Sequence, residues 1–148
     1  MQLTRAHALT LNWSGAGQVL HFILLNMARA ADWEGRGDAL LAHEYGHIWL
    51  QATGYWSPEY DNSCLAIHSG DIVPGVLIRE ETRRRGFDYM EFWKRPQEAW
   101  LAAQQGPVEL DRCQRMQLAS AYLDARLGLT NALWEKREQF LGAIGRDY

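Results

Sequence analysis

The sequence predicts a small α+β protein, with an N-terminal β-hairpin or small sheet packed on a helix and a mostly helical C-terminal half. Three observations lead to this fold class. Large apolar and polar side chains alternate over residues 3–13, apolar side chains recur at helical spacing over 39–52, and helix-forming stretches dominate the C-terminal half. The 148 residues suffice for one domain with a buried core, so we expect a single domain over 1–148.

Four parts are expected within this domain. They are a hairpin region (1–37), a motif-bearing helix (38–53), a long loop (54–75) and a helical part (76–148).

The hairpin is predicted from two strand patterns around a turn. Alternation over 3–13 indicates a half-buried strand, because successive side chains of a strand point to opposite faces. Residues 14–17, Ser-Gly-Ala-Gly, indicate a turn, and the apolar run VLHFILLN over 19–26 indicates a more fully buried second strand. We interpret His7 and His21, which fall in this region, as structural strand residues.

A helix is predicted over 39–52. Asp38 is expected to cap it by accepting hydrogen bonds from its first N–H groups, and Gly54 is expected to end it. One face of this helix is expected to pack on the hairpin, and it carries Leu41, Tyr45, Ile48 and Ala52.

The segment 54–75 contains many Ser, Asp, Pro and Gly residues and is expected to be a long irregular loop, of the kind that is usually functional or mobile. The stretch 87–93 is aromatic-rich and ambiguous. Helices are predicted over 76–85, 97–105 and 108–127, and a final helix is predicted to end near 141. Pro96 is expected in the first turn of the second of these helices.

Composition excludes several classes of protein. A net charge of −3 and a pI of about 5.9 give no electrostatic footprint for nucleic acid. No stretch is long enough to cross a bilayer, so we expect no membrane association and a cytoplasmic protein. Cys64 and Cys113 are too few for a disulfide scaffold and are expected to be buried or idle thiols, a single bridge between them being the alternative.

The run His43-Glu44-Tyr45-Gly46-His47 carries the chemistry. On a helix, His43 and His47 project from the same face one turn apart, and two imidazoles at that spacing can bind one Zn²⁺. Glu44 points to the adjoining side, where its carboxylate can take a proton from a water that the metal has acidified. The spacing therefore predicts a catalytic zinc site with Glu44 as general base.

A catalytic zinc site needs a third protein ligand. The metzincin pattern would require histidine and glycine where this chain has Thr53 and Leu50, so that class is excluded. We expect Glu98 to be the third ligand, because a carboxylate on an apolar helix face needs a partner. The competing candidates are Glu80, Glu81, Glu91, His68 and Asp71.

The order of two strands, a helix with LLAHEYGHIWLQ (40–51) and a later helix with RPQEAWLA (95–102) resembles the gluzincin-type metallopeptidases. These include the minimal gluzincins and, more distantly, the ImmA/IrrE-type peptidases that cleave bacterial and phage repressors. The resemblance covers about residues 3–105 and implies a small zincin-like domain with zinc on His43, His47 and Glu98. Two features differ: Ala102 replaces a polar residue that often orients a motif histidine, and the Ala-Asn element of the repressor-cleaving group is absent.

A donor near the zinc would stabilise the oxyanion of amide hydrolysis. We single out His68 for this catalytic role, with Tyr55, Tyr60, Arg95 and Tyr122 as alternatives; Asp61 or Asp71 could orient a ligand histidine. The predicted function is zinc-dependent hydrolysis of peptide bonds in a protein or peptide substrate. The alternatives are an interaction module with a structural zinc site and a zinc hydrolase acting on a non-peptide amide. The oligomeric state is open.

Overall fold

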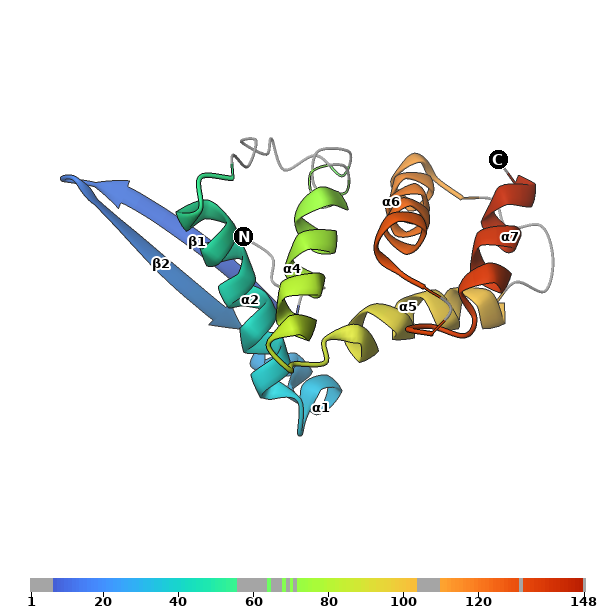
Figure 1. Cartoon of the computed structure of the whole chain (residues 1–148), viewed down its shortest axis with the longest axis horizontal. Coiled ribbons are helices and arrows are strands. Elements are labelled where there is room, and N and C mark those ends of the chain that lie inside the picture. The colour runs from blue at the N-terminus through green and yellow to red at the C-terminus, as the bar shows by residue number, and fades with distance from the viewer. Residues whose placement is uncertain are drawn as a thin grey trace. The chain divides into compact units, whose positions relative to one another are not determined.

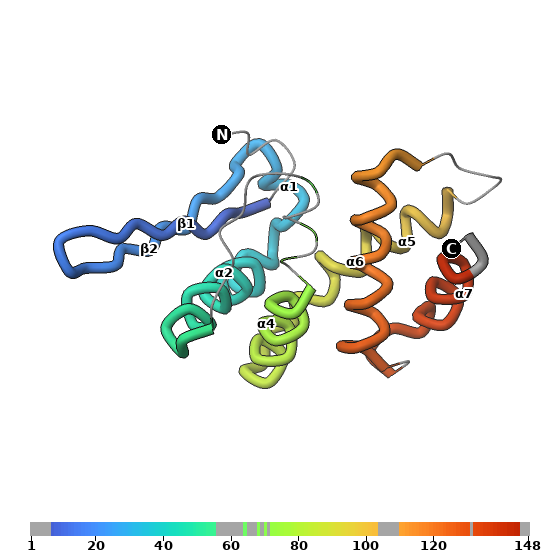
Figure 2. The backbone as a smooth tube through the Cα atoms, turned by 90° about the horizontal axis from the view of Figure 1, so that it is seen from above, coloured from blue at the N-terminus to red at the C-terminus, as the bar shows by residue number. Residues whose placement is uncertain are grey.

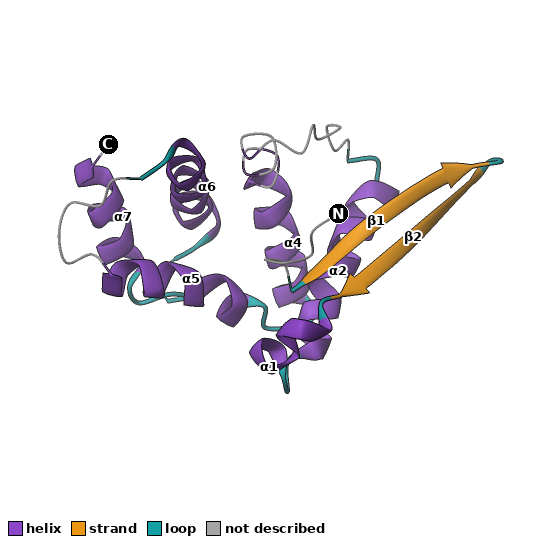
Figure 3. Ribbon diagram, turned by 180° about the vertical axis from the view of Figure 1, so that it is seen from behind, coloured by secondary structure: helices purple, strands orange, loops and turns teal. Residues whose placement is uncertain are grey.

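The computed structural model describes residues 7–55, 64, 68, 70, 72–103, 110–130 and 132–147. The α+β class is confirmed: within the described residues, the strands lie in an N-terminal hairpin and helices make up most of the remaining chain (Figures 1 and 3). The elements are β1 (Ala8–Gly15), β2 (Gln18–Leu25), the 3₁₀ helix η1 (Met27–Arg29), α1 (Ala30–Trp33), α2 (Gly37–Ala52), α4 (Ile72–Arg84), α5 (Met90–Ala103), α6 (Arg112–Gly128) and α7 (Arg137–Asp147). None of the described helices is long and apolar enough to cross a membrane.

The chain divides into two compact units. The first combines Met1–Trp56 with Glu81–Tyr89, and the second combines Ser57–Glu80 with Met90–Tyr148. The single domain expected over 1–148 stays a prediction.

The first unit contains the predicted hairpin, with a shorter turn than expected because β1 continues through Gly15. Strands β1 and β2 pair antiparallel with Ala8 opposite Leu25, and their turn extends beyond the end of α2 (Figure 2). Ala16 and Gly17 form the turn with φ of 50° and 75°, which suits a two-residue hairpin connection of the twisted type I′. Gly17 adopts its φ without strain, whereas Ala16 holds a left-handed conformation that costs about 1–2 kcal/mol for a residue with a Cβ.

The expected burial of the second strand is wrong. Val19, Leu20 and Phe22 are 53%, 45% and 49% exposed. In the observed register Leu20 lies opposite Trp13 and Phe22 opposite Leu11, so these side chains share one face of the ribbon. The alternate face carries Thr10, which contacts α2, and the apolar face therefore points away from that helix.

Helix α2 begins at Gly37, so Asp38 lies in its first turn and is not the expected cap. The Asp38 side chain accepts a hydrogen bond from the Ala39 N–H at 2.8 Å. Gly54, at φ 83°, follows the helix end as expected. The face expected to pack on the hairpin is instead exposed: Tyr45 is 61% and Leu41 37% accessible. The neighbouring face, through Glu44, contacts β1.

Several boundaries in the rest of the chain also differ from expectation. Part of the predicted loop 54–75 is helical, since Cys64, His68 and Gly70 are helical and α4 begins at Ile72. Helix α5 begins at Met90, which places Pro96 inside it and not in its first turn. The final helix runs from Arg137 to Asp147, beyond the end expected near 141.

The core of the second unit brings α5, α6 and α7 together. Aromatic rings dominate it: Trp134 and Phe140 are almost fully buried, and Trp100 meets Phe140 edge to face with ring centroids 5.7 Å apart. Asp111 is the N-cap of α6 and forms a capping box with Gln114. The Asp111 carboxylate accepts a hydrogen bond from the Gln114 N–H, and the Gln114 side chain accepts one from the Asp111 N–H.

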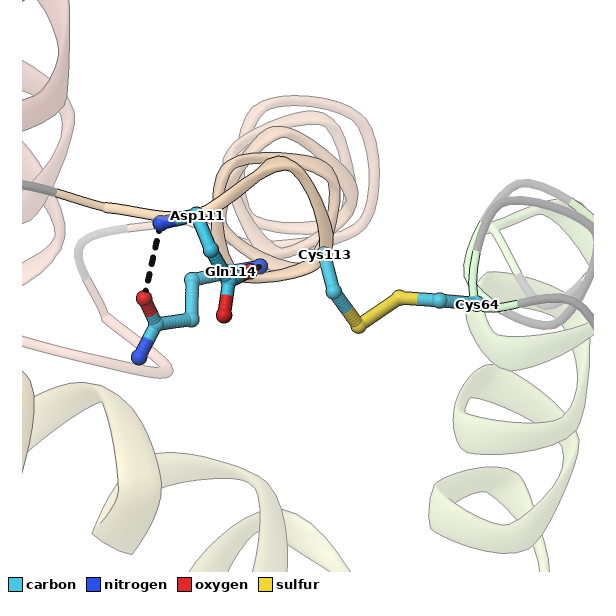
Figure 4. The surroundings of a disulfide bond; sticks show 4 residues. All are labelled: Cys64, Asp111, Cys113 and Gln114. Atoms are coloured by element: carbon cyan, nitrogen blue, oxygen red, sulfur yellow. Dashed lines mark hydrogen bonds between the residues drawn. A yellow bond between two sulfur atoms is a disulfide. The ribbon is translucent and has the colours of Figure 1, made fainter.

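Cys64 and Cys113 form a disulfide and are not the free thiols that we expected (Figure 4). Their Cα atoms lie 5.6 Å apart, in the usual range for such a bond. Because 49 positions separate the two residues, the bond closes a long loop. In the chain-entropy view, that closure contributes about 4 kcal/mol by restricting the unfolded chain.

A buried ion pair also stabilises the second unit. Both guanidinium Nη atoms of Arg79 donate to the two Asp124 carboxylate oxygens, at 2.6 and 2.5 Å, and the guanidinium lies over the Trp93 ring at 5.4 Å. Arg79 is 5% and Asp124 8% exposed. The bidentate geometry lets each buried charge offset the desolvation of the other.

Replacing Asp124 with alanine is expected to lower the free energy of unfolding by about 3–5 kcal/mol, because it removes the carboxylate that neutralises a buried guanidinium. Urea unfolding followed by circular dichroism measures this loss. Arg84→Ala, which removes an exposed ion pair with Glu81, is the control and should leave the unfolding midpoint unchanged. Equal midpoints for the two variants would contradict a stabilising role for the buried pair.

Candidate metal centre on helix α2

The two motif histidines lie side by side in the first unit. His43 and His47 are one turn apart on α2, with ring centroids 5.1 Å apart and ring planes at 84°. A zinc ion binds imidazole nitrogens at about 2.0–2.1 Å, so two rings at this separation can reach the same ion after small side-chain rotations. The arrangement therefore places two of the predicted ligands together.

Both histidines are partly buried. Burial lowers the pKa of His47, because removal from water disfavours the charged imidazolium. Neutral imidazole is the form that binds a metal, so this environment favours a ligand role at neutral pH.

Tyr89 contributes a contact that the sequence did not single out. Its ring stacks on His43 with centroids 3.9 Å apart and planes at 10°. Tyr89 lies in the aromatic-rich stretch 87–93 that was ambiguous from sequence, and no local pattern connects that stretch to the motif helix. The stacked ring restricts the orientation of the His43 imidazole.

Glu44 lies on the side of α2 that faces β1. It is only 6% exposed, and its Oε2 accepts a hydrogen bond from the Thr10 hydroxyl at 2.7 Å. The same hydroxyl lies 3.2 Å from the Glu44 carbonyl oxygen. The hydrogen bond holds the Glu44 carboxyl group in one orientation against β1.

Glu98, the expected third ligand, belongs to the second unit. There its Oε1 accepts a hydrogen bond from Trp134 Nε1 at 3.1 Å and lies 3.6 Å from Lys136 Nζ. The carboxylate thus has protein partners of its own. Its assignment as a zinc ligand stays a prediction.

His68, singled out for catalysis, also lies in the second unit, beside the disulfide. The His68 carbonyl accepts from the Ser120 hydroxyl at 3.0 Å, and burial lowers the pKa of its imidazole. Its oxyanion role stays a prediction. Tyr60, Asp61 and Asp71 lie outside the described residues.

Glu81, a competing ligand candidate, has other partners. Hydrogen bonds from two guanidinium groups, chiefly Arg84 and to a smaller extent Arg85, lower the pKa of its carboxyl to about 2. The carboxylate therefore stays ionised and bound to two guanidinium groups. It also lines a groove of about 550 Å³ with Leu41, Tyr45, Trp49, Thr82 and Phe87. At 100° per residue, Tyr45 and Trp49 lie on the side of α2 opposite the histidine pair, so this groove is separate from the candidate centre.

Among the residues that the structure describes, one group of three potential ligands is close enough to share a metal, and it consists of Cys64, His68 and Cys113. The histidine pair of α2 has no third histidine, cysteine or carboxylate in such a group within the described part of the first unit. Comparison of the chain with protein-family models, curated proteins and solved structures gives no match.

Thr10→Val is expected to destabilise the protein by about 1–3 kcal/mol, because it removes a hydrogen-bond donor to a buried carboxylate while keeping the side-chain shape. The change is measured as a shift of the urea midpoint. Thr10→Ser retains the hydroxyl and is the matched control, expected to unfold close to the wild type. If Thr10→Val is no less stable than Thr10→Ser, the hydrogen bond does not hold Glu44 on β1.

Proposed function

We propose that the protein is a zinc-dependent metallopeptidase that hydrolyses peptide bonds in a protein or peptide substrate. The observation that carries the proposal is the pair of imidazoles, His43 and His47, at 5.1 Å on one helix with Glu44 held between that helix and β1. The three side chains come from the same five-residue run.

The donor set suits zinc. His43 and His47 offer two imidazole nitrogens, and one carboxylate, for which we propose Glu98, would complete a set of two histidines and one glutamate that leaves a coordination position open. Zinc in such a site acidifies water and polarises a carbonyl group.

Glu44 is the proposed general base. Its carboxylate would accept a proton from the attacking water and return it to the amine that leaves when the peptide bond breaks. The hydroxyl of Thr10 would hold the Glu44 carboxyl group in position for both transfers. Tyr89, stacked on His43, would act as a positioning residue for the ligand imidazole.

The second candidate function is an interaction module in which a metal only joins parts of the chain. The group of Cys64, His68 and Cys113 favours it, because with the disulfide reduced these residues would offer the thiolate and imidazole ligands that are typical of structural zinc sites. The two functions differ in what they require of Glu44, since a structural site has no use for a carboxylate that accepts protons.

Glu44→Gln is expected to retain zinc and to lose at least about a hundredfold in peptidase activity, because the amide cannot accept the proton. Metal analysis of the purified protein and cleavage of a mixed peptide library measure the two properties. Glu135→Gln, an exposed glutamate in the second unit, is the matched control and should behave as wild type. An active Glu44→Gln enzyme would exclude the proposed mechanism, and an inactive wild type with full zinc would favour the interaction module.

The ligand set is tested separately. His43→Ala, His47→Ala and Glu98→Ala are each expected to weaken zinc binding by more than the roughly 10–100-fold that loss of an outer partner costs. Competition with a chromophoric chelator measures the affinity. Glu91→Ala, a change to another carboxylate of α5, is the comparison for Glu98→Ala. If zinc affinity survives in Glu98→Ala and falls in Glu91→Ala, the third ligand is Glu91; if all the variants bind as wild type, α2 carries no zinc.

A further inference from the structure

We propose that Cys64, His68 and Cys113 form a second metal site, which binds Zn²⁺ through two thiolates and one imidazole when their disulfide is reduced. The three residues belong to the second unit, so this inference does not depend on the peptidase proposal for α2.

The three side chains lie close enough together to reach one metal ion. Each of the three residues is partly buried, and their potential ligand atoms all lie within 4.8 Å of one another. In a tetrahedral site with Zn–S near 2.3 Å and Zn–N near 2.05 Å, a sulfur and a nitrogen lie about 3.5 Å apart and two sulfurs about 3.8 Å. Side-chain rotations that move the ligand atoms by about 1–2 Å therefore suffice to convert the group into a zinc site.

All three ligands come from helical residues. Cys64 and His68 are four positions apart in the sequence, and each is helical. Cys113 is the second residue of α6 and lies between Asp111 and Gln114, the two residues of the capping box (Figure 4). The helix N-terminus favours a thiolate at that position. The Ser120 hydroxyl, about two turns further along α6, donates to the His68 carbonyl and holds the His68 backbone against the same helix.

The donor chemistry selects the metal. Thiolates are soft ligands and imidazole is a borderline one, and zinc is bound by this combination in Cys₂His sites. Hard cations such as Mg²⁺ bind oxygen ligands instead. Three protein ligands leave a fourth position for water or another donor.

The disulfide and the metal site exclude each other. A thiol reductant such as glutathione supplies two electrons and two protons to the Cys64–Cys113 bond and is itself oxidised to a disulfide, leaving two thiols. Binding of Zn²⁺ then releases both thiol protons, because the ligands are thiolates. In a compartment where thiols stay reduced, the metal would join Cys64 and His68 to Cys113 in place of the covalent bond.

Cobalt is the probe, because a thiolate bound to Co²⁺ gives a charge-transfer band in the near ultraviolet that the sulfur-free pair His43 and His47 cannot give. The full chain is reduced with a phosphine and titrated with Co²⁺ without oxygen, beside a sample oxidised with diamide. The reduced protein is expected to show the band and to lose it when Zn²⁺ is added, whereas the oxidised protein shows none. A reduced protein without the band would overturn the proposal.

Variants assign the ligands. Cys113→Ser is expected to remove most of the charge-transfer band, and His68→Ala to weaken Co²⁺ binding at least about tenfold while thiolate absorption persists. His21→Ala, a partly buried histidine of the hairpin that hydrogen-bonds to Asn12, is the matched control and should titrate as wild type. An affinity in His68→Ala equal to wild type would show that His68 is no ligand and would overturn the three-residue site.

A measurement on the wild type covers the case in which Cys113→Ser does not fold. The alkylation rate of the reduced cysteines by iodoacetamide is compared with and without Zn²⁺. Protection by at least about tenfold is expected, since a metal-bound thiolate reacts slowly. Equal rates would contradict metal binding by the two sulfurs.

Discussion

The first unit depends on how a buried carboxylate is accommodated. Glu44 lies on the face of α2 that packs on the hairpin, where an ionised group is costly unless donors reach it. The hydroxyl of Thr10 supplies one donor across the interface, and it does so only if the face of β1 that carries Thr10 turns toward the helix. That requirement decides which face of the hairpin meets α2. Helix geometry places His43 and His47 beside each other on an adjoining face of α2, so the candidate metal centre lies next to this contact without depending on it.

This constraint explains what sequence patterns could and could not predict in the first unit. The hairpin, its Ala-Gly turn and the helix over 39–52 were predictable because their signals are local: alternation, turn residues and helical periodicity. The packing was not, because we assumed that the most apolar faces meet. Leu41 and Tyr45 are exposed, and the apolar face around Leu20 and Phe22 points away from α2. A polar contact outweighed the apolar pattern in deciding which faces meet.

The second unit shows the same division between local and distant interactions. Helix α6 begins at Arg112, after a capping box at Asp111 that is contained within four residues, a local signal that the predicted start at 108 did not use. The pairing of Arg79 with Asp124 spans 45 positions and that of Cys64 with Cys113 spans 49, and no periodicity connects residues so far apart. Pro96 misled the prediction for a physical reason as well. Proline favours the first helical turn, yet it is tolerated inside α5, where it removes one backbone donor.

Both proposed metal sites are built in the same way. Each takes two ligands that are four positions apart in the sequence, His43 with His47 and Cys64 with His68, and each needs a further ligand from another part of the chain. On α2, helix geometry alone places the two histidines side by side, so the sequence can reveal them. The further ligand depends on tertiary folding. Cys113 meets its pair within one compact unit, whereas the assignment of Glu98 to the histidine pair rests on a resemblance in the sequence. Ligand type then separates the two sites chemically: nitrogen and oxygen donors do not change with redox state, while two thiolates are lost on oxidation. A redox change would therefore alter the metal content of the second unit and leave the histidine pair of α2 as it was, so the two sites can be assayed independently in the same full-length chain.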